Sequence, residues 1–112
     1  AVKNFQHSGA CGPWLPSADE ITNPMDLRLT TCLNGEVVQD ESTAQLYYTV
    51  PDIIAYVSQF TPLHPGDVIA TGTPSGVGAG RKPPLWMQPG DRITVEISGL
   101  GKLANNVVAE AD

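Results

Sequence analysis

Positive charge is scarce in this 112-residue chain, which has six Lys and Arg residues against twelve Asp and Glu, for a formal net charge of −6. Proteins that bind nucleic acids or anionic membranes through phosphate groups need Lys and Arg side chains gathered on one surface. No basic run occurs anywhere in the sequence. The composition therefore excludes nucleic acids and anionic membrane surfaces as partners.

Long hydrophobic runs are also absent. Hydrophobic residues make up 41% of the chain, but no run approaches the roughly 20 apolar residues that a membrane-spanning helix needs. The first residues do not follow the pattern of a signal peptide. We therefore expect a cytoplasmic protein without a membrane-spanning segment.

The chain has only two cysteines, Cys11 and Cys32, and their separation does not match a zinc site or a redox motif. The sequence leaves a disulfide between them open. Without a secretion signal it favours two reduced thiols that pack as small hydrophobic side chains. A P-loop, a dinucleotide fingerprint and a Ser-His-Asp order are absent as well, so the common nucleotide-binding and hydrolase motifs do not apply.

What the sequence has in abundance is proline and glycine, ten and eleven residues respectively, which interrupt the chain too often for long helices. Apolar and polar residues alternate over residues 27–33, the period of a half-buried strand. The Asn34-Gly35 pair that follows favours a type I′ turn, so residues 36–39 should return antiparallel. Further strands are expected at 67–71, 92–98 and 102–109.

One main helix is expected, over residues 50–61. The tetrapeptide beginning at Thr49 resembles a capping box with Pro51 in the first turn. Apolar residues then recur at helical spacing, and Pro62 should end the helix. The predicted fold class is α+β, dominated by strands, with residues 1–112 forming one domain at most.

Residues 65–78, PGDVIATGTPSGVG, run from an apolar segment directly into a loop of glycine, proline and hydroxyl residues. Glycines allow positive φ angles and leave backbone N–H groups uncovered, while threonine and serine add hydroxyl donors. Such a loop can bind a carboxylate or an enolate oxygen, although a glycine and proline cluster also fits an ordinary turn between strands. The candidates here are Gly72, Thr73, Gly76 and Gly78, with Thr71 and Ser75.

Charged candidates are few. Lys3 stands in a segment with little other charge and is either part of a site or a solvated side chain near a terminus. His7 could serve as a base or a ligand near Lys3, or it could be an exposed loop histidine. Adjacent carboxylates, at positions 19–20 and 40–41, point apart on a strand, so the main ligands of any metal ion must lie elsewhere.

Taken together, several motifs in order resemble the fumarylacetoacetate hydrolase family. The loop at residues 65–78 is accompanied by KNF at 3–5, GPW at 12–14, DL at 26–27, LNGE at 33–36, VPDIIAY at 50–56 and RKPPLWM at 81–87. A second PGD at 89–91 and the segment GLGKLAN at 99–105 extend the match to the family's usual C-terminus. The chain is thus similar to the C-terminal half of the family's catalytic domain.

The resemblance implies a mixed β-roll, a homodimer and a site that uses Mg²⁺, Mn²⁺ or Ca²⁺ to act on small 2-oxo or 1,3-dioxo acids. It implies C–C bond hydrolysis of acylpyruvate-like or fumarylacetoacetate-like substrates. Decarboxylation or isomerisation in aromatic catabolism, and a non-catalytic β domain, remain the alternatives. All of the reactions require stabilisation of an enolate.

The resemblance implies site roles for four residues, Lys3, His7, Gly72 and Thr73. Lys3 corresponds to an ammonium group close to the metal ion and the substrate oxygens. Thr73, with Gly72 before it, corresponds to the residue whose hydroxyl or N–H group meets those oxygens. His7 stands where some members place a hydroxyl near the metal, so Lys3 and His7 are near-metal candidates. The main metal ligands would lie upstream of Ala1, on an N-terminal part that would be a necessary partner.

Overall fold

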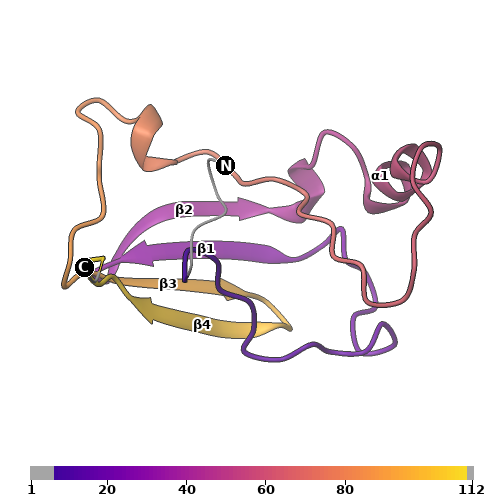
Figure 1. Cartoon of the computed structure of the whole chain (residues 1–112), viewed down its shortest axis with the longest axis horizontal. Helices are drawn as coiled ribbons and strands as arrows, with labels where there is room; N and C mark the ends of the chain where they lie inside the picture. Colours follow the sequence, from indigo (N-terminus) through magenta and orange to yellow (C-terminus); the bar gives the residue numbers. More distant parts are fainter. Residues whose placement is uncertain (1–6, 111–112) are drawn as a thin grey trace.

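The computed structural model describes residues 7–110, which form a four-stranded sheet and one α-helix (Figure 1). Every ladder among the described residues is antiparallel, and the strand order is β2-β1-β3-β4. The β-dominated fold with one main helix is confirmed. The elements are β1 (Arg28–Leu33), β2 (Glu36–Ser42), a 3₁₀ turn (Thr43–Gln45), α1 (Val50–Val57), a second 3₁₀ turn (Gly78–Gly80), β3 (Arg92–Ile97) and β4 (Gly101–Asn106).

The β1–β2 hairpin forms as predicted. Asn34 and Gly35 have φ angles of 53° and 89°, the left-handed values that a type I′ turn requires. β2 runs further than expected, to Ser42, and contains a β-bulge. The register pairs Thr31 with Gln39 but Cys32 with Val37, so Val38 is the extra residue of the bulge.

Helix α1 begins with the predicted capping box. The Thr49 hydroxyl accepts a hydrogen bond from the Asp52 backbone N–H at 3.3 Å, and the Asp52 carboxylate accepts one from the Thr49 backbone N–H at 3.0 Å. The helix ends at Val57, earlier than the predicted residue 61. Residues 58–60 continue as tighter turns with i to i+3 bonds, which commonly close a helix.

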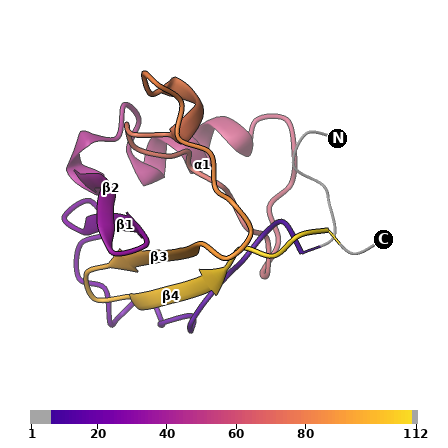
Figure 2. The ribbon, with the colours of Figure 1, turned by 90° about the vertical axis from the view of Figure 1, so that its left-hand side faces the viewer.

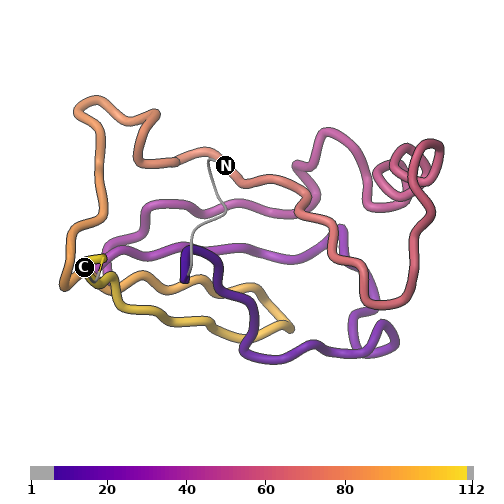
Figure 3. The backbone as a smooth tube through the Cα atoms, viewed as in Figure 1, coloured from indigo at the N-terminus to yellow at the C-terminus, as the bar shows by residue number. Residues whose placement is uncertain are grey.

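The predicted strand at residues 67–71 is wrong, because this segment has no regular secondary structure and pairs with no strand among the described residues. A short apolar segment becomes a strand only where a neighbouring strand completes the ladder. In the described part of the chain none lies beside it, and Val68 is 88% exposed. The segment instead forms part of the connection from α1 to β3, which returns along the β2 edge of the sheet before turning into β3 (Figure 3).

One face of the sheet is apolar and only partly covered. Cross-strand pairs place apolar residues of β1, β3 and β4 on the same face, namely Leu29 with Ile97, Leu33 with Ile93, and Val95 with Leu103. The N-terminal segment passes beside the β3–β4 hairpin (Figure 2). The Trp14 ring occupies the space that a side chain at Gly101 would need. None of these apolar side chains is fully buried.

The chain exposes much more surface than a compact protein of its mass. Its accessible surface is 9169 Å², whereas a compact monomer of this mass exposes roughly 6000 Å². Its radius of gyration is 15.7 Å, against about 13 Å for a compact domain of this length. Among residues 7–110 only Thr31 is buried, and no hydrophobic side chain is. The sheet therefore lacks a second layer within the described residues.

Two Pro-Gly-Asp turns, at residues 65–67 and 89–91, are structurally equivalent. Gly66 and Gly90 both have a φ angle of 99°, and the Asp of each turn accepts a backbone N–H bond of 2.7 Å from the residue three positions earlier. The two carboxylates differ in their further partners: Asn34 of the β1–β2 turn donates its side-chain N–H to Asp91 at 2.8 Å, whereas Asp67 lies 4.0 Å from the exposed His64 imidazole. This bond fastens the hairpin turn to the start of β3.

The Asn34 side chain and, secondly, the Gln88 backbone N–H lower the pKa of the Asp91 carboxyl from its usual value of 3.8. A carboxyl group whose pKa is lowered by folding stabilises the folded state above its unfolded pKa, and that contribution disappears as the pH falls through the folded pKa. We expect Asp91→Asn to lower the melting temperature of the complete protein by a few degrees at pH 7. The difference from the parent should shrink progressively below about pH 4.

The matched control is Asp67→Asn, which removes the same turn carboxylate without an Asn34 partner. Thermal unfolding of both variants at pH 7 should show the larger decrease for Asp91→Asn. Equal decreases would show that the Asn34 contact does not stabilise the fold.

Candidate functional site

The loop at residues 71–76 is attached to the edge strand β2 by the side chain of Gln39. The Gln39 amide nitrogen donates to the Thr73 hydroxyl oxygen at 3.0 Å and to the Pro74 carbonyl oxygen at 2.9 Å. Because β2 is an outer strand of the sheet, its outward edge has no strand neighbour in the described residues. The loop therefore lies against this edge through side-chain bonds and not through a ladder.

Two glycines give this loop its shape, and they differ in their surroundings. Gly72 has a φ angle of 108°, and no atom of the described residues lies within 4 Å of the place where a Cβ atom would stand. Gly76 has a φ angle of 99°, and a Cβ atom there would collide with the carbonyl oxygen of Val38. Gly72 thus leaves its backbone open to an approaching ligand, while Gly76 allows the loop to approach the bulge of β2.

Arg81 joins the same two elements. Its Nη2 atom donates to the Val38 carbonyl oxygen at 2.5 Å, and its Nε atom donates to the Gly76 carbonyl oxygen at 3.0 Å. The bulge at Val38 removes this carbonyl from the regular register of the β1–β2 ladder, and the guanidinium group supplies its partner. One side chain therefore fixes the loop after Thr73 to the strand that carries Gln39.

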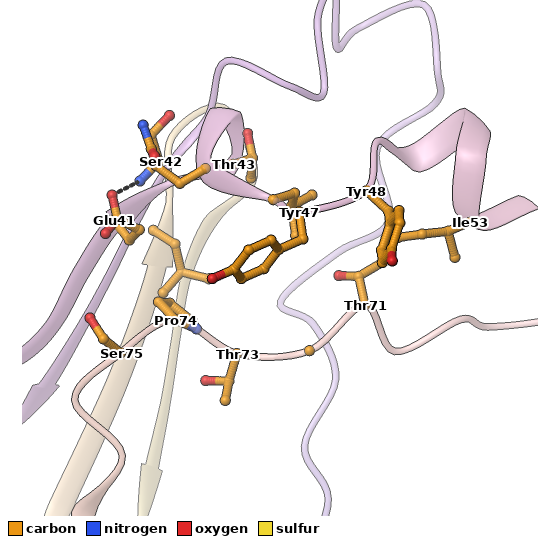
Figure 4. A pocket seen from close by; sticks show the side chains of 14 residues that line it. Glu41, Ser42, Thr43, Tyr47, Tyr48, Ile53, Thr71, Thr73, Pro74 and Ser75 are labelled. Carbon is orange, nitrogen blue, oxygen red and sulfur yellow. Dashed lines mark hydrogen bonds between the residues drawn. The ribbon is translucent and has the colours of Figure 1, made fainter. Parts of the chain in front are cut away.

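An open cleft of about 710 Å³ lies between this loop and the chain that follows β2 (Figure 4). Tyr47 projects across it toward Pro74, and Tyr48 lies over Thr71 beside Ile53. Both tyrosines are exposed, Tyr47 completely and Tyr48 at 71%. In Figure 4 the side chain of Thr73 points away from the Tyr47 ring, so the loop presents Thr73 and the tyrosines on different sides.

The lining of the cleft is rich in hydroxyl groups and poor in charge. Among the described residues that line it, Glu41 is the only charged one, and its carboxylate accepts the backbone N–H of Ser42 at 3.1 Å. No Lys or Arg of residues 7–110 lines the cleft. Hydroxyl and backbone N–H groups can bind the oxygen atoms of a small acid, but positive charge for its carboxylate has to come from residues outside this lining.

The predicted site residues are only partly placed by the structure. Lys3 lies outside the described residues, so its proximity to Thr73 stays a prediction. His7 is exposed, with a φ angle of 59°, and forms no group of metal-binding side chains with other described residues. Gly72 and Thr73 lie in the loop beside β2, and their contact with a substrate stays a prediction.

Among residues 7–110, no three His, Cys, Asp or Glu side chains come together as metal ligands. Asp40 is paired with Arg28, whose side chain lowers the pKa of the Asp40 carboxyl. The described residues therefore do not form a divalent-cation site by themselves, and the predicted ligands upstream of Ala1 stay a prediction. Cys11 and Cys32 are both free. No helix in the described part of the chain is long and apolar enough to cross a membrane.

Sequence reasoning missed the attachment of the loop to β2. Gln39 was predicted only as a residue of the returning strand, because nothing in its immediate sequence indicates a partner 34 residues away. The structure also places Tyr47 and Tyr48 in the lining of the cleft, and no motif in the sequence around them indicates a cleft.

Comparison with known proteins gives concordant matches. The chain is 47% identical to a putative HpcE protein from Mycobacterium smegmatis, with a TM-score of 0.84 over 88% of this chain and 36% of that one. It is 39% identical to the maleylpyruvate hydrolase of Sphingobium sp. SYK-6 in complex with manganese(II) and pyruvate, with a TM-score of 0.78 over 87% of this chain and 34% of that one.

Among curated proteins, the chain is 45% identical to the human mitochondrial oxaloacetate tautomerase FAHD2B over 106 residues. The matched region covers 95% of this chain and 34% of FAHD2B. The chain thus spans about a third of the length of these relatives. Residues 1–108 match the family described as fumarylacetoacetate (FAA) hydrolase C-terminal. With nearly the whole chain matched and the fold shared, the protein belongs to the fumarylacetoacetate hydrolase family.

Proposed function

We propose that this chain is the C-terminal part of an enzyme that acts on small 2-oxo or 1,3-dioxo acids through an enolate. C–C bond hydrolysis of acylpyruvate-like substrates is the reaction we favour, as in the maleylpyruvate hydrolase to which the chain is similar. Tautomerisation is the second candidate, since the FAHD2B relative is an oxaloacetate tautomerase. Another relative is a delta-isomerase, and these reaction types share an enolate or enol next to a carbonyl group.

The observation that carries this proposal is the loop at Gly72 and Thr73. Gly72 leaves its backbone uncovered, and the Thr73 hydroxyl stands in a fixed place at the edge of β2. Hydrogen-bond donors that are already in place stabilise the negative charge of an enolate oxygen without reorganisation during the reaction. Within residues 7–110 no Lys or Arg lines the cleft, which supports the proposal that cationic groups come from Lys3 and from chain outside the described residues.

We further propose that the complete protein depends on a divalent cation, Mg²⁺ or Mn²⁺, because the maleylpyruvate hydrolase relative was crystallised with manganese(II) and pyruvate. The described residues offer no ligand group for it. An upstream part of the same polypeptide would supply the ligands and, with residues 1–112, complete the catalytic domain. Assembly as a homodimer is part of the same proposal.

The test is turnover by the complete protein of a panel consisting of oxaloacetate, for tautomerisation and decarboxylation, and acylpyruvates, for C–C bond hydrolysis. At least one substrate should be converted in the presence of Mg²⁺ or Mn²⁺, and a chelator should abolish the activity. Lys3→Ala should reduce kcat roughly a hundredfold with an unchanged melting temperature, because an ammonium group near the enolate is lost. Lys102→Ala, which removes an exposed lysine paired with Glu96, is the control.

Unchanged kinetics of Lys3→Ala would remove Lys3 from the mechanism. If no member of the panel is converted with either cation, the chain is better described as a β domain without this activity.

A further inference from the structure

We propose that Gln39 is a positioning residue that orients the hydroxyl group of Thr73, so that its hydrogen atom is available to the oxygen of a bound oxo acid. This inference rests on the proposed function, in which Thr73 contacts the substrate. Gln39 itself need not touch the substrate, since it would act through the direction of the Thr73 hydroxyl.

The orientation of the Gln39 amide follows from its two partners. The carbonyl oxygen of Pro74 can only accept a hydrogen bond, so the amide nitrogen of Gln39, and not its oxygen, must face it. The same nitrogen lies 3.0 Å from the Thr73 hydroxyl oxygen. With two hydrogen atoms, it donates to both groups at once. The Thr73 hydroxyl oxygen is therefore an acceptor in this pair.

Because Gln39 donates and the Thr73 hydroxyl accepts, the hydroxyl keeps its own hydrogen atom for another partner. A hydroxyl group has one hydrogen atom to donate, and here the bond to Gln39 does not use it. Accepting a bond also polarises the hydroxyl group and makes it a stronger donor. The Thr73 side chain is exposed, so its hydrogen atom can be donated to an enolate or carboxylate oxygen.

The contact is held by more than one bond. The bulge at Val38 directly precedes Gln39 in β2, and bulges commonly redirect a neighbouring side chain beside functional sites. Arg81 joins the Val38 and Gly76 carbonyl oxygens. Because both ends of the loop segment are fixed to the same strand, the distance between Gln39 and Thr73 does not depend on one side chain alone.

The experiment compares Gln39→Glu with the parent in the complete protein, using the substrate of the panel that the parent converts fastest. A glutamate carboxylate has the shape of the amide but only accepts hydrogen bonds, so the Thr73 hydroxyl would turn to donate to it. We expect kcat and kcat/KM to fall together, about tenfold, as for an interaction made in the transition state. Gln59→Glu, in an exposed turn outside the cleft lining, should leave both values unchanged.

A double-mutant cycle with Thr73→Val separates positioning from a general effect on the loop. Thr73→Val alone should lower kcat about a hundredfold, and adding Gln39→Glu should then have no further effect. If Gln39→Glu lowers kcat equally in both backgrounds, the residue supports the loop and does not act through the hydroxyl. Gln39→Met, which is uncharged and similar in length, provides a second variant should Gln39→Glu not fold.

The two proposals fail in different ways. Full activity of Thr73→Val would overturn the proposed role of Thr73 in substrate binding. A slow Thr73→Val variant combined with fully active Gln39→Glu and Gln39→Met variants would overturn only the positioning role of Gln39.

Discussion

Replacing Gly76 with alanine is expected to destabilise the complete protein by about 2–3 kcal/mol more than Gly66→Ala does and to lower kcat/KM about a hundredfold. A Cβ atom at Gly76 would collide with the Val38 carbonyl oxygen, which is backbone of β2 and cannot move independently of the sheet. The loop would have to move away from the strand. It would then lose its bonds from Gln39 and Arg81, each worth about 1 kcal/mol.

Gly66 provides a closely matched control for this substitution. Its φ angle of 99° is the same as that of Gly76, but within residues 7–110 no atom lies within 4 Å of the position that its Cβ atom would take. Gly66→Ala therefore includes the strain of a positive φ angle without the collision, and the difference between the two variants isolates the contact with β2.

Denaturant unfolding of both variants gives their loss of stability, and steady-state kinetics give the change in kcat/KM. Equal losses of stability would show that the loop moves away from Val38 at no cost. A destabilised Gly76→Ala variant with normal turnover would show that the attachment of the loop to β2 does not matter for catalysis.

Residues 1–112 produced by themselves are expected to show no cooperative unfolding transition, or to associate. Burial of apolar surface provides most of the stability of a folded domain, and no hydrophobic side chain is buried within residues 7–110. The exposed area of 9169 Å² exceeds that of a compact monomer by roughly 3000 Å². The apolar face of the sheet, with residues such as Leu33, Ile93 and Val95, has little to pack against.

Thermal unfolding followed by near-ultraviolet circular dichroism, with binding of a hydrophobic dye and sedimentation, tests this expectation. The complete polypeptide is the control and should unfold cooperatively without binding the dye. A sharp transition of the 112-residue chain as a monomer would show that this single layer is stable without any cover.

Local structure could be predicted from the sequence where a few neighbouring residues decide the backbone. The left-handed turn at Asn34 and Gly35 and the capping box of Thr49 and Asp52 depend on contacts within four residues, and both formed as expected. The strand at 67–71 was wrong, because a ladder needs a partner strand, which a short apolar segment does not supply by itself.

The candidate site, too, was predictable from the sequence only in part. The glycine and hydroxyl composition of the loop indicated that oxygen atoms could bind there, and the order of motifs along the chain indicated the family, which the comparisons confirmed. Neither indicated that Gln39 contacts Thr73. Neither distinguished Gly76, which has no room for a side chain, from Gly72, which has.

By itself, then, the sequence determined the family, the turns, the helix start and the strands of both hairpins, since each is encoded by residues close together or in a recognisable order. Only the tertiary structure decided how the loop at Thr73 is held against β2, and that the Thr73 hydroxyl accepts a hydrogen bond from Gln39. Those features arise where the bulge at Val38 meets residues more than thirty positions later in the chain. Their geometry depends on distances between separate elements, which no local pattern specifies.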